Sequence, residues 1–419
     1  MSRANRRRLE FATGFLFLSL LLLMGGCNLY APYSAHYARL APRRLVVLCP
    51  PGRQNLACVR EILDFKRSQG FEPEILVIDK AQDLPDLPLR LKSISEANPG
   101  PIYALILATA EEIPMGYWMI EGLDEAICSD LPYFLGQVVS QDKAIPDELW
   151  QLAVDDDFPW LIGRIPFSDE ETLEIVFRST MHYCSRPRSS KPSALLGAGR
   201  FAFWGDSSFV MSRARNALRG RGWHTTFIGQ DPPCEERFQR EDIMVTNSFG
   251  KRFPVEISFP RRWQNESPDL VYLISHGSFW GMDPYIDVNQ LAAFDQHFGE
   301  TVRPEHPAIL VTTGCGAGNP NSLILKELFR RGWICGFLGS TENNGPWPLA
   351  PAISAEINLA RFLGNGSSVS AAVQGLKECF WDHSRWSPTY WFLPFARRIA
   401  RTNILSYVYY GDPTLRLRT

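Results

Sequence analysis

Residues 269–277 read DLVYLISHG and residues 308–318 read AILVTTGCGAG. Each stretch is an apolar run that ends at a reactive side chain beside glycine, His276 in the first and Cys315 in the second. Short apolar runs of this kind are typical of buried strands. In open α/β sheets, ligands bind beyond the carboxyl ends of the strands. The two stretches therefore predict a base and a sulfur nucleophile at one edge of one sheet.

This pairing has a chemical and a structural interpretation. A cysteine that attacks a carbonyl needs a nearby imidazole and backbone N–H donors for the oxyanion. Gly277 and the glycines on both sides of Cys315 can bring such donors close without a Cβ in the way. A single cysteine after a strand is, however, often just a small buried side chain. A single histidine likewise often only packs or caps, so the residues alone leave both interpretations open.

Strand and helix patterns alternate along the rest of the chain. We expect strands at 45–48, 74–78, 103–108, 160–162, 194–197, 224–228 and 333–338, and helices at 57–69, 169–183, 207–219 and 321–331. This alternation predicts a parallel sheet covered by helices. The polar, proline-bearing segment 185–192 predicts a linker between an N-terminal α/β subdomain, residues 43–190, and a second subdomain, residues 191–419. Residues 230–260 have no clear pattern and are expected to form loops at the rim of the site.

Several further blocks occur in a defined order. They are HGS with Trp280 close by, the TTGCGAG turn, GFLGSTENNGPW at 336–347, YYGDPTLRLR at 409–418 and, upstream, ALILATAEEIP at 104–114, SDLPY at 129–133 and DDDFPWLIGRIPFSDEETLEIV at 155–176. From about Leu105 to the C-terminus, this ordered set resembles the gingipain-type cysteine peptidases, which share the caspase-like fold. The resemblance implies an α/β, caspase-like three-layer sandwich with a mostly parallel sheet and two similar subdomains, of which 191–419 is catalytic.

The resemblance also implies roles for individual residues. His276 would transfer protons, Cys315 would be the nucleophile, and the N–H groups of Gly277 and Cys315 would form the oxyanion hole. Trp347 and Trp280 would contact the substrate. An acidic residue that orients the imidazole is not assigned; the upstream candidates are Asp130, Asp155, Asp156 and Asp157.

The function that this implies is a cysteine endopeptidase that hydrolyses protein or peptide substrates through a Cys-His dyad. Two alternatives stay open. The chain could be a catalytically inactive caspase-like lipoprotein that serves as a binding or assembly scaffold, or it could use the same thiol in acyltransferase-like chemistry.

The N-terminus predicts export and lipidation. Residues 1–26 combine a basic start, an apolar run over Phe11–Met24 and small residues before Cys27, which is the order of a bacterial lipoprotein signal peptide. We expect Cys27 to carry the lipid, residues 27–42 to form a tether, and the protein to be membrane-anchored in the bacterial cell envelope. The alternative is an uncleaved anchor, but the apolar run is shorter than the roughly 20 residues that a spanning helix needs.

Composition narrows the possible partners. The 419-residue chain is 45% hydrophobic and 12% aromatic, so it can bury a large core. Its net charge is −2, with no basic block beyond the extreme N-terminus, which argues against nucleic acid as a partner.

Cofactor and metal signals are weak. No dinucleotide fingerprint is present, and His297, His306 and Cys315 lack zinc-ligand spacing. We therefore expect no cofactor. The acidic run 155–157 could hold a structural Ca²⁺, although a solvated turn is the favoured interpretation.

Seven of the nine cysteines have no assigned role, and most are expected to be small buried side chains. Cys49 and Cys58 are the only close pair that could form a disulfide.

Overall fold

The computed structural model describes residues 43–417 except 81, 99, 121–125, 137–146, 155–157, 188–190, 202–204, 230–233, 238, 240, 247–250, 299–302, 343–348 and 387–393. Within these residues, eleven strands form one large sheet. The strands are β1 (Arg44–Cys49), β2 (Glu72–Val77), β3 (Ile102–Leu107), β6 (Trp160–Ile165), β7 (Ser193–Ala198), β10 (His224–Gly229), β11 (Glu236–Arg237), β14 (Leu270–Ile274), β18 (Ala308–Thr312), β19 (Ile334–Ser340) and β20 (Tyr407–Gly411). Their order across the sheet is β11-β10-β7-β14-β18-β19-β20-β6-β3-β1-β2.

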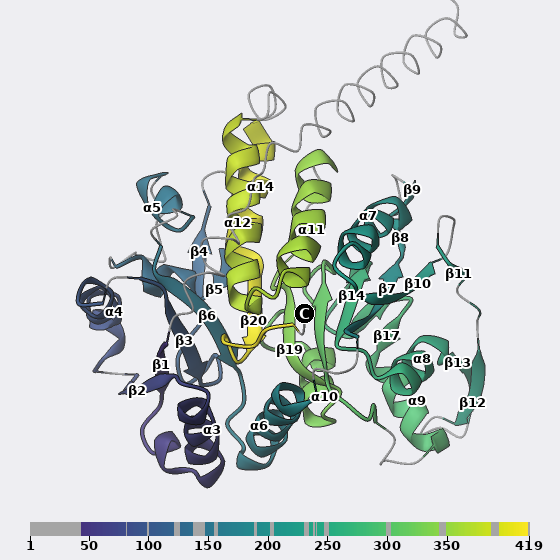
Figure 1. The fold of residues 1–419 in the computed structure, drawn as a ribbon, viewed down its shortest axis with the longest axis horizontal. Coiled ribbons are helices and arrows are strands. Elements are labelled where there is room, and N and C mark those ends of the chain that lie inside the picture. Colours follow the sequence, from purple (N-terminus) through teal and green to yellow (C-terminus); the bar gives the residue numbers. More distant parts are fainter. Residues whose placement is uncertain are drawn as a thin grey trace, which may run out of the picture.

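The sheet consists of two parallel blocks that run in opposite directions. The strands β2, β1, β3 and β6 are parallel to one another, as are β11, β10, β7, β14, β18 and β19. The C-terminal strand β20 joins the blocks, because it pairs antiparallel with β19 and parallel with β6. Figure 1 shows β20 in yellow at the centre, between the purple and blue N-terminal half and the green C-terminal half.

Helices cover both faces of the sheet. One face carries α4 (Leu87–Glu96), α5 (Asp147–Leu152), α7 (Ser208–Arg219), α11 (Leu349–Gly364), α12 (Val369–Trp386) and α14 (Pro394–Ser406). The other carries α3 (Ala57–Ser68), α6 (Glu170–Ser185), α8 (Ser258–Glu266), α9 (Val288–Phe298) and α10 (Leu323–Arg330). Successive residues of one strand pack into the cores on opposite faces of the sheet. In β1, Val46 and Leu48 pack on the first face, and Leu45 and Val47 pack on the second. The fold is therefore a three-layer α/β arrangement, as expected from doubly covered parallel strands.

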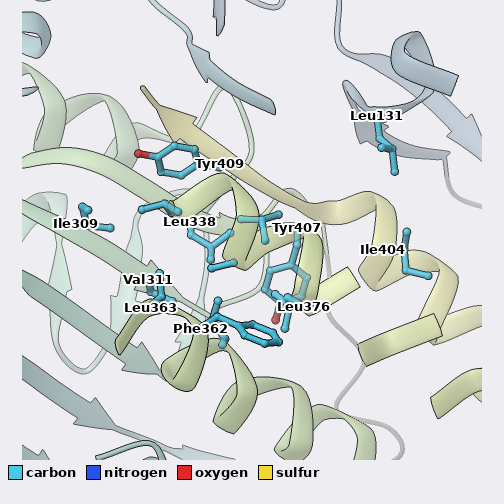
Figure 2. Close-up of a cluster of buried hydrophobic side chains, with 14 of the residues drawn as sticks. Leu131, Ile309, Val311, Leu338, Phe362, Leu363, Leu376, Ile404, Tyr407 and Tyr409 are labelled. Carbon is cyan, nitrogen blue, oxygen red and sulfur yellow. The ribbon is translucent and has the colours of Figure 1, made fainter. Parts of the chain in front are cut away.

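One cluster of buried side chains packs strands β18 and β19, near the turn with Cys315, against the C-terminal helices. Figure 2 shows Val311 of β18 and Leu338 of β19 beside Phe362, Leu363 and Leu376 of α11 and α12. All five are buried. Burying one such side chain is worth about 1.5–3 kcal/mol. The carboxyl ends of β18 and β19 are thus fixed by the packing of the C-terminal helices.

Several short strands and 3-10 helices lie outside the main sheet. They are β4 (Gly116–Met119) with β5 (Ala126–Ser129), β8 (Arg200–Phe201) with β9 (Gly205–Asp206), β12 (Asp242–Thr246) with β13 (Arg252–Glu256), and the three-stranded set β15 (His276–Gly277), β16 (Gly281–Asp283) and β17 (Ile286–Asp287). The short 3-10 helices are η1 (Arg53–Asn55), η2 (Leu84–Asp86) and η3 (Leu131–Leu135).

The predicted strands and helices are confirmed, with ends displaced by a few residues. The expectation of irregular loops over residues 230–260 is wrong for part of that segment. There β12 and β13 form an antiparallel hairpin, because Ile243, Val245 and Val255 are buried on one side of it. The division at residue 190 and the similarity of the two subdomains stay predictions; the sheet itself is continuous across both halves.

Candidate active site

His276 and Cys315 leave the sheet from neighbouring parallel strands. Strand β14 pairs with β18 up to Leu273 opposite Thr312, and the N–H of Thr313 still donates to the carbonyl of Leu273 at 3.2 Å. His276 follows the end of β14 by two residues, and Cys315 follows the end of β18 by three. Both residues therefore lie at the same edge, the carboxyl edge of the C-terminal block.

The two loops touch through glycine. A Cβ on Gly277 would lie 2.5 Å from both the Cα and the carbonyl carbon of Gly314, and 2.8 Å from the nitrogen of Cys315. A Cβ on Gly314 would lie 2.9 Å from the Cα of Gly277. Carbon atoms in contact sit about 3.5–4.0 Å apart, so neither position has room for a side chain. The absence of a Cβ is what allows the backbone after His276 to reach the N–H of Cys315.

Backbone hydrogen bonds fix the turn that carries Cys315. Gly316 N–H donates to the carbonyl of Glu342 at 3.0 Å, and Gly318 N–H donates to the carbonyl of Ser340 at 2.8 Å. Gly316 has a φ of 65°, in the left-handed region that glycine adopts without strain. The buried hydroxyl of Tyr410 donates to the carbonyl of Gly318 at 2.8 Å. The glycine-rich turn is therefore tied to β19 and β20 rather than loosely held.

The loop after His276 is a tight hairpin. Strand β15 pairs antiparallel with β16, which places His276 opposite Asp283. The N–H of Ser278 donates to the carbonyl of Gly281 at 2.9 Å, closing the hairpin over Phe279 and Trp280. Directly opposed residues in a ladder present their side chains on the same face. Asp283 is thus an acidic neighbour of His276 that the sequence analysis missed, because it becomes apparent only once the hairpin register is known.

Cys315 differs from most other described cysteines in exposure. Cys49, Cys58, Cys128, Cys335 and Cys379 are buried, whereas Cys315 is partly exposed and His276 is exposed. Burial raises the pKa of Cys49 to about 11 and that of Cys128 to about 12. Such thiols stay protonated and unreactive near neutral pH.

The expected role of the other cysteines as small buried side chains holds for these five. Cys49 and Cys58 both carry free thiols, so the possible disulfide between them is not formed.

Asp130, one of the four candidates for orienting the imidazole, is committed elsewhere. Its two carboxylate oxygens accept from Nε and Nη2 of Arg164 at 2.8 and 2.6 Å, and both residues are buried. Arg164 also donates to the carbonyls of Ala108 and Ile113. Arg164 therefore secures the loop after β3, and its partner Asp130 serves the fold.

The remaining predicted residues divide into two groups. Trp280 lies at the tip of the hairpin that starts at His276, and 58% of it is exposed. Trp347, Cys27 and the acidic run 155–157 lie outside the described residues, as do residues 1–42 with the signal peptide and tether. The roles given to them stay predictions.

The described part of the chain holds no group of three or more His, Cys, Asp or Glu side chains arranged to bind a metal ion. Across those same residues, no helix is both long and apolar enough to cross a membrane.

The sequence matches no protein family and no curated protein. In fold, the chain is similar to a solved structure described as "Structure of Protease", with a TM-score of 0.64 and 12% sequence identity over 90% of this chain and 79% of that one. A second solved structure, a periplasmic ribose ABC transporter from Conexibacter woesei, aligns with a TM-score of only 0.19 at 9% identity over 77% of this chain and 85% of that one. The second alignment carries no weight. The first establishes a shared fold.

Proposed function

We propose that this protein is an exported, lipid-anchored cysteine endopeptidase whose dyad is Cys315 and His276. The observation that carries the proposal is the contact between the two loops at Gly277 and Gly314, which brings the residues after β14 and β18 together. The shared fold with a solved protease and the resemblance to the gingipain-type peptidases support it. The N-terminal order of basic, apolar and small residues before Cys27 supports export and lipidation.

In the first half of the reaction, the thiolate of Cys315 attacks the peptide carbonyl carbon, and the carbonyl π electrons move onto oxygen. The oxyanion is held by the N–H groups of Gly277 and Cys315; a Cβ on Gly277 would lie 2.8 Å from the nitrogen of Cys315. As the C–N bond breaks, protonated His276 gives its proton to the leaving nitrogen, and an acyl-thioester remains on Cys315.

In the second half, His276 takes a proton from water, and the resulting hydroxide attacks the thioester carbonyl. The C–S bond breaks, the carboxylic acid product leaves, and the thiolate and the imidazolium are restored. Only water and the peptide are consumed, so the reaction needs no metal or cofactor to balance.

Asp283 is the positioning residue in this proposal. It stands opposite His276 in the β15–β16 ladder, where directly opposed residues present their side chains on the same face. A carboxylate there would hold the imidazole in one orientation. Asp283→Asn should lower kcat while KM and the melting temperature change little, whereas a purely structural Asp283 would lower the melting temperature and leave kcat in place.

Hydrolysis of a broad peptide library by the mature protein tests the proposal. Cys315→Ala should abolish cleavage, and His276→Ala should reduce it by about 10²–10⁴-fold, the usual worth of general acid–base help. Cys184→Ala is the matched control, because Cys184 is another partly exposed thiol but lies on α6, away from this edge. Undiminished cleavage by Cys315→Ala would contradict the assignment of Cys315 as the nucleophile. No cleavage by the parent protein would contradict the peptidase proposal and favour the scaffold interpretation.

A further inference from the structure

Three large apolar side chains are exposed next to the candidate dyad. Phe279 is 43% exposed, Trp280 58% and Leu323 40%. Phe279 and Trp280 form the tip of the hairpin that begins at His276, and Leu323 is the first residue of α10. We call these three side chains the apolar tip. Contiguous exposed apolar patches mark binding surfaces, and hydrogen bonds to the Phe279 carbonyl join the hairpin tip to the start of α10.

The apolar tip is held together by its backbone. The carbonyl of Phe279 accepts from the N–H groups of Leu323 and Ile324 at 2.9 and 3.2 Å, and from the hydroxyl of Ser322 at 3.3 Å. The carbonyl of Trp280 accepts from the N–H of Val288 at 2.9 Å. These hydrogen bonds hold the start of α10 and the hairpin tip together as one unit. The exposed side chains of the apolar tip are not needed to hold that unit together.

The apolar tip is also continuous with both halves of the dyad. Phe279 and Trp280 follow His276 by three and four residues within one hairpin, and the chain from Cys315 leads through its anchored turn into α10. In the proposed reaction His276 protonates the departing amine, so the leaving-group segment of the substrate lies on the His276 side. Phe279 and Trp280 belong to the hairpin that starts at His276, which assigns the hairpin tip to that same side of the scissile bond.

We propose that the apolar tip is a subsite for a large apolar side chain of the substrate on the leaving-group side of the scissile bond. This inference rests on the proposed peptidase function and adds the class of substrate. A rigid aromatic surface loses little conformational freedom when it binds, which is why aromatic residues dominate binding energies. Covering these side chains with an apolar residue of the substrate removes apolar area of both partners from water.

The test compares internally quenched peptides that share one acyl-side sequence and carry either Leu or Ser in the leaving-group segment. The wild-type protein should show a kcat/KM for the Leu peptide about 10-fold or more above that for the Ser peptide. Trp280→Ala should bring this ratio towards 1, and Leu323→Ala, placed on the helix rather than the hairpin, should lower it independently. Phe209→Ala is the matched control, because Phe209 is 47% exposed on α7, outside this unit, and should leave the ratio unchanged.

The outcomes separate the two proposals. If the wild-type protein cleaves both peptides with equal kcat/KM, or if Trp280→Ala changes only a preference on the acyl side, the subsite is refuted while the peptidase proposal stands. If the wild-type protein cleaves neither these peptides nor a broad library, the peptidase proposal fails and the subsite fails with it.

Discussion

A methyl group at Gly277 should separate the loop that follows His276 from the loop that carries Cys315. Its carbon would lie 2.5 Å from two backbone atoms of Gly314, about 1 Å closer than carbon atoms normally approach. Because these neighbours are backbone, they can yield only if one loop moves. A misplacement of about 1 Å can cost about 10²-fold in rate, equivalent to about 2.7 kcal/mol of activation free energy. Gly277→Ala should therefore lower kcat/KM by about that factor. Gly314→Ala, with its nearest contact at 2.9 Å, should have a milder effect.

The assay is peptide hydrolysis at a temperature well below the melting point, with the melting temperature measured in parallel. Overpacking itself costs about 1–3 kcal/mol of stability, so a control with the same strain elsewhere is needed. Gly163→Ala supplies it, since its methyl group would lie 2.5 Å from the carbonyl oxygen of Gly411, between β6 and β20. Gly163→Ala should lose stability and keep its activity. A Gly277→Ala protein with full activity and an unchanged melting temperature would refute the contact between the loops.

Three further predictions concern residues away from that contact. Burial lowers the pKa of Lys377 on α12 to about 8, with nearby Asp130 opposing the shift. Unfolding then takes up a proton between about pH 8 and 10.5, so stability should rise with pH across that window. Lys377→Met should flatten this rise and stabilise the protein by about 3 kcal/mol at pH 7; an unchanged pH dependence in denaturant titrations would contradict it. Cys27→Ser should release the protein from the membrane fraction after a high-salt wash, and continued firm binding would indicate an ordinary anchor. Trp347→Ala should lose turnover while keeping its melting temperature; a large drop in melting temperature with unchanged specific activity would assign Trp347 to the core.

The sequence was most informative where burial is continuous. The apolar runs 270–274 and 308–312 have the pattern of strands covered on both faces, and both are fully buried strands in the structure. Their glycine-flanked ends indicated which residues leave the sheet. What the sequence could not show is that glycine at 277 and 314 serves the approach of one loop to another, because such a contact depends on two segments about forty residues apart.

The order and direction of the strands could not be predicted from the sequence, for a physical reason. Strand β20 is as fully buried as β19, and burial carries no information on which partner a strand selects or which way it runs. Its place between β19 and β6 is known only from the structure. Asp283 was missed for a related reason, since its place opposite His276 depends on the hairpin register.

Site-resolved labelling of the native, mature protein with a peptide-like electrophile tests the central claim most directly. Thiolate character and access set the rate of such labelling, and most other described cysteines are buried. We predict that mass spectrometry will find Cys315 modified ahead of every other cysteine, and that His276→Ala will slow this modification. A native protein in which Cys315 stays unlabelled and reacts only after denaturation would contradict the account.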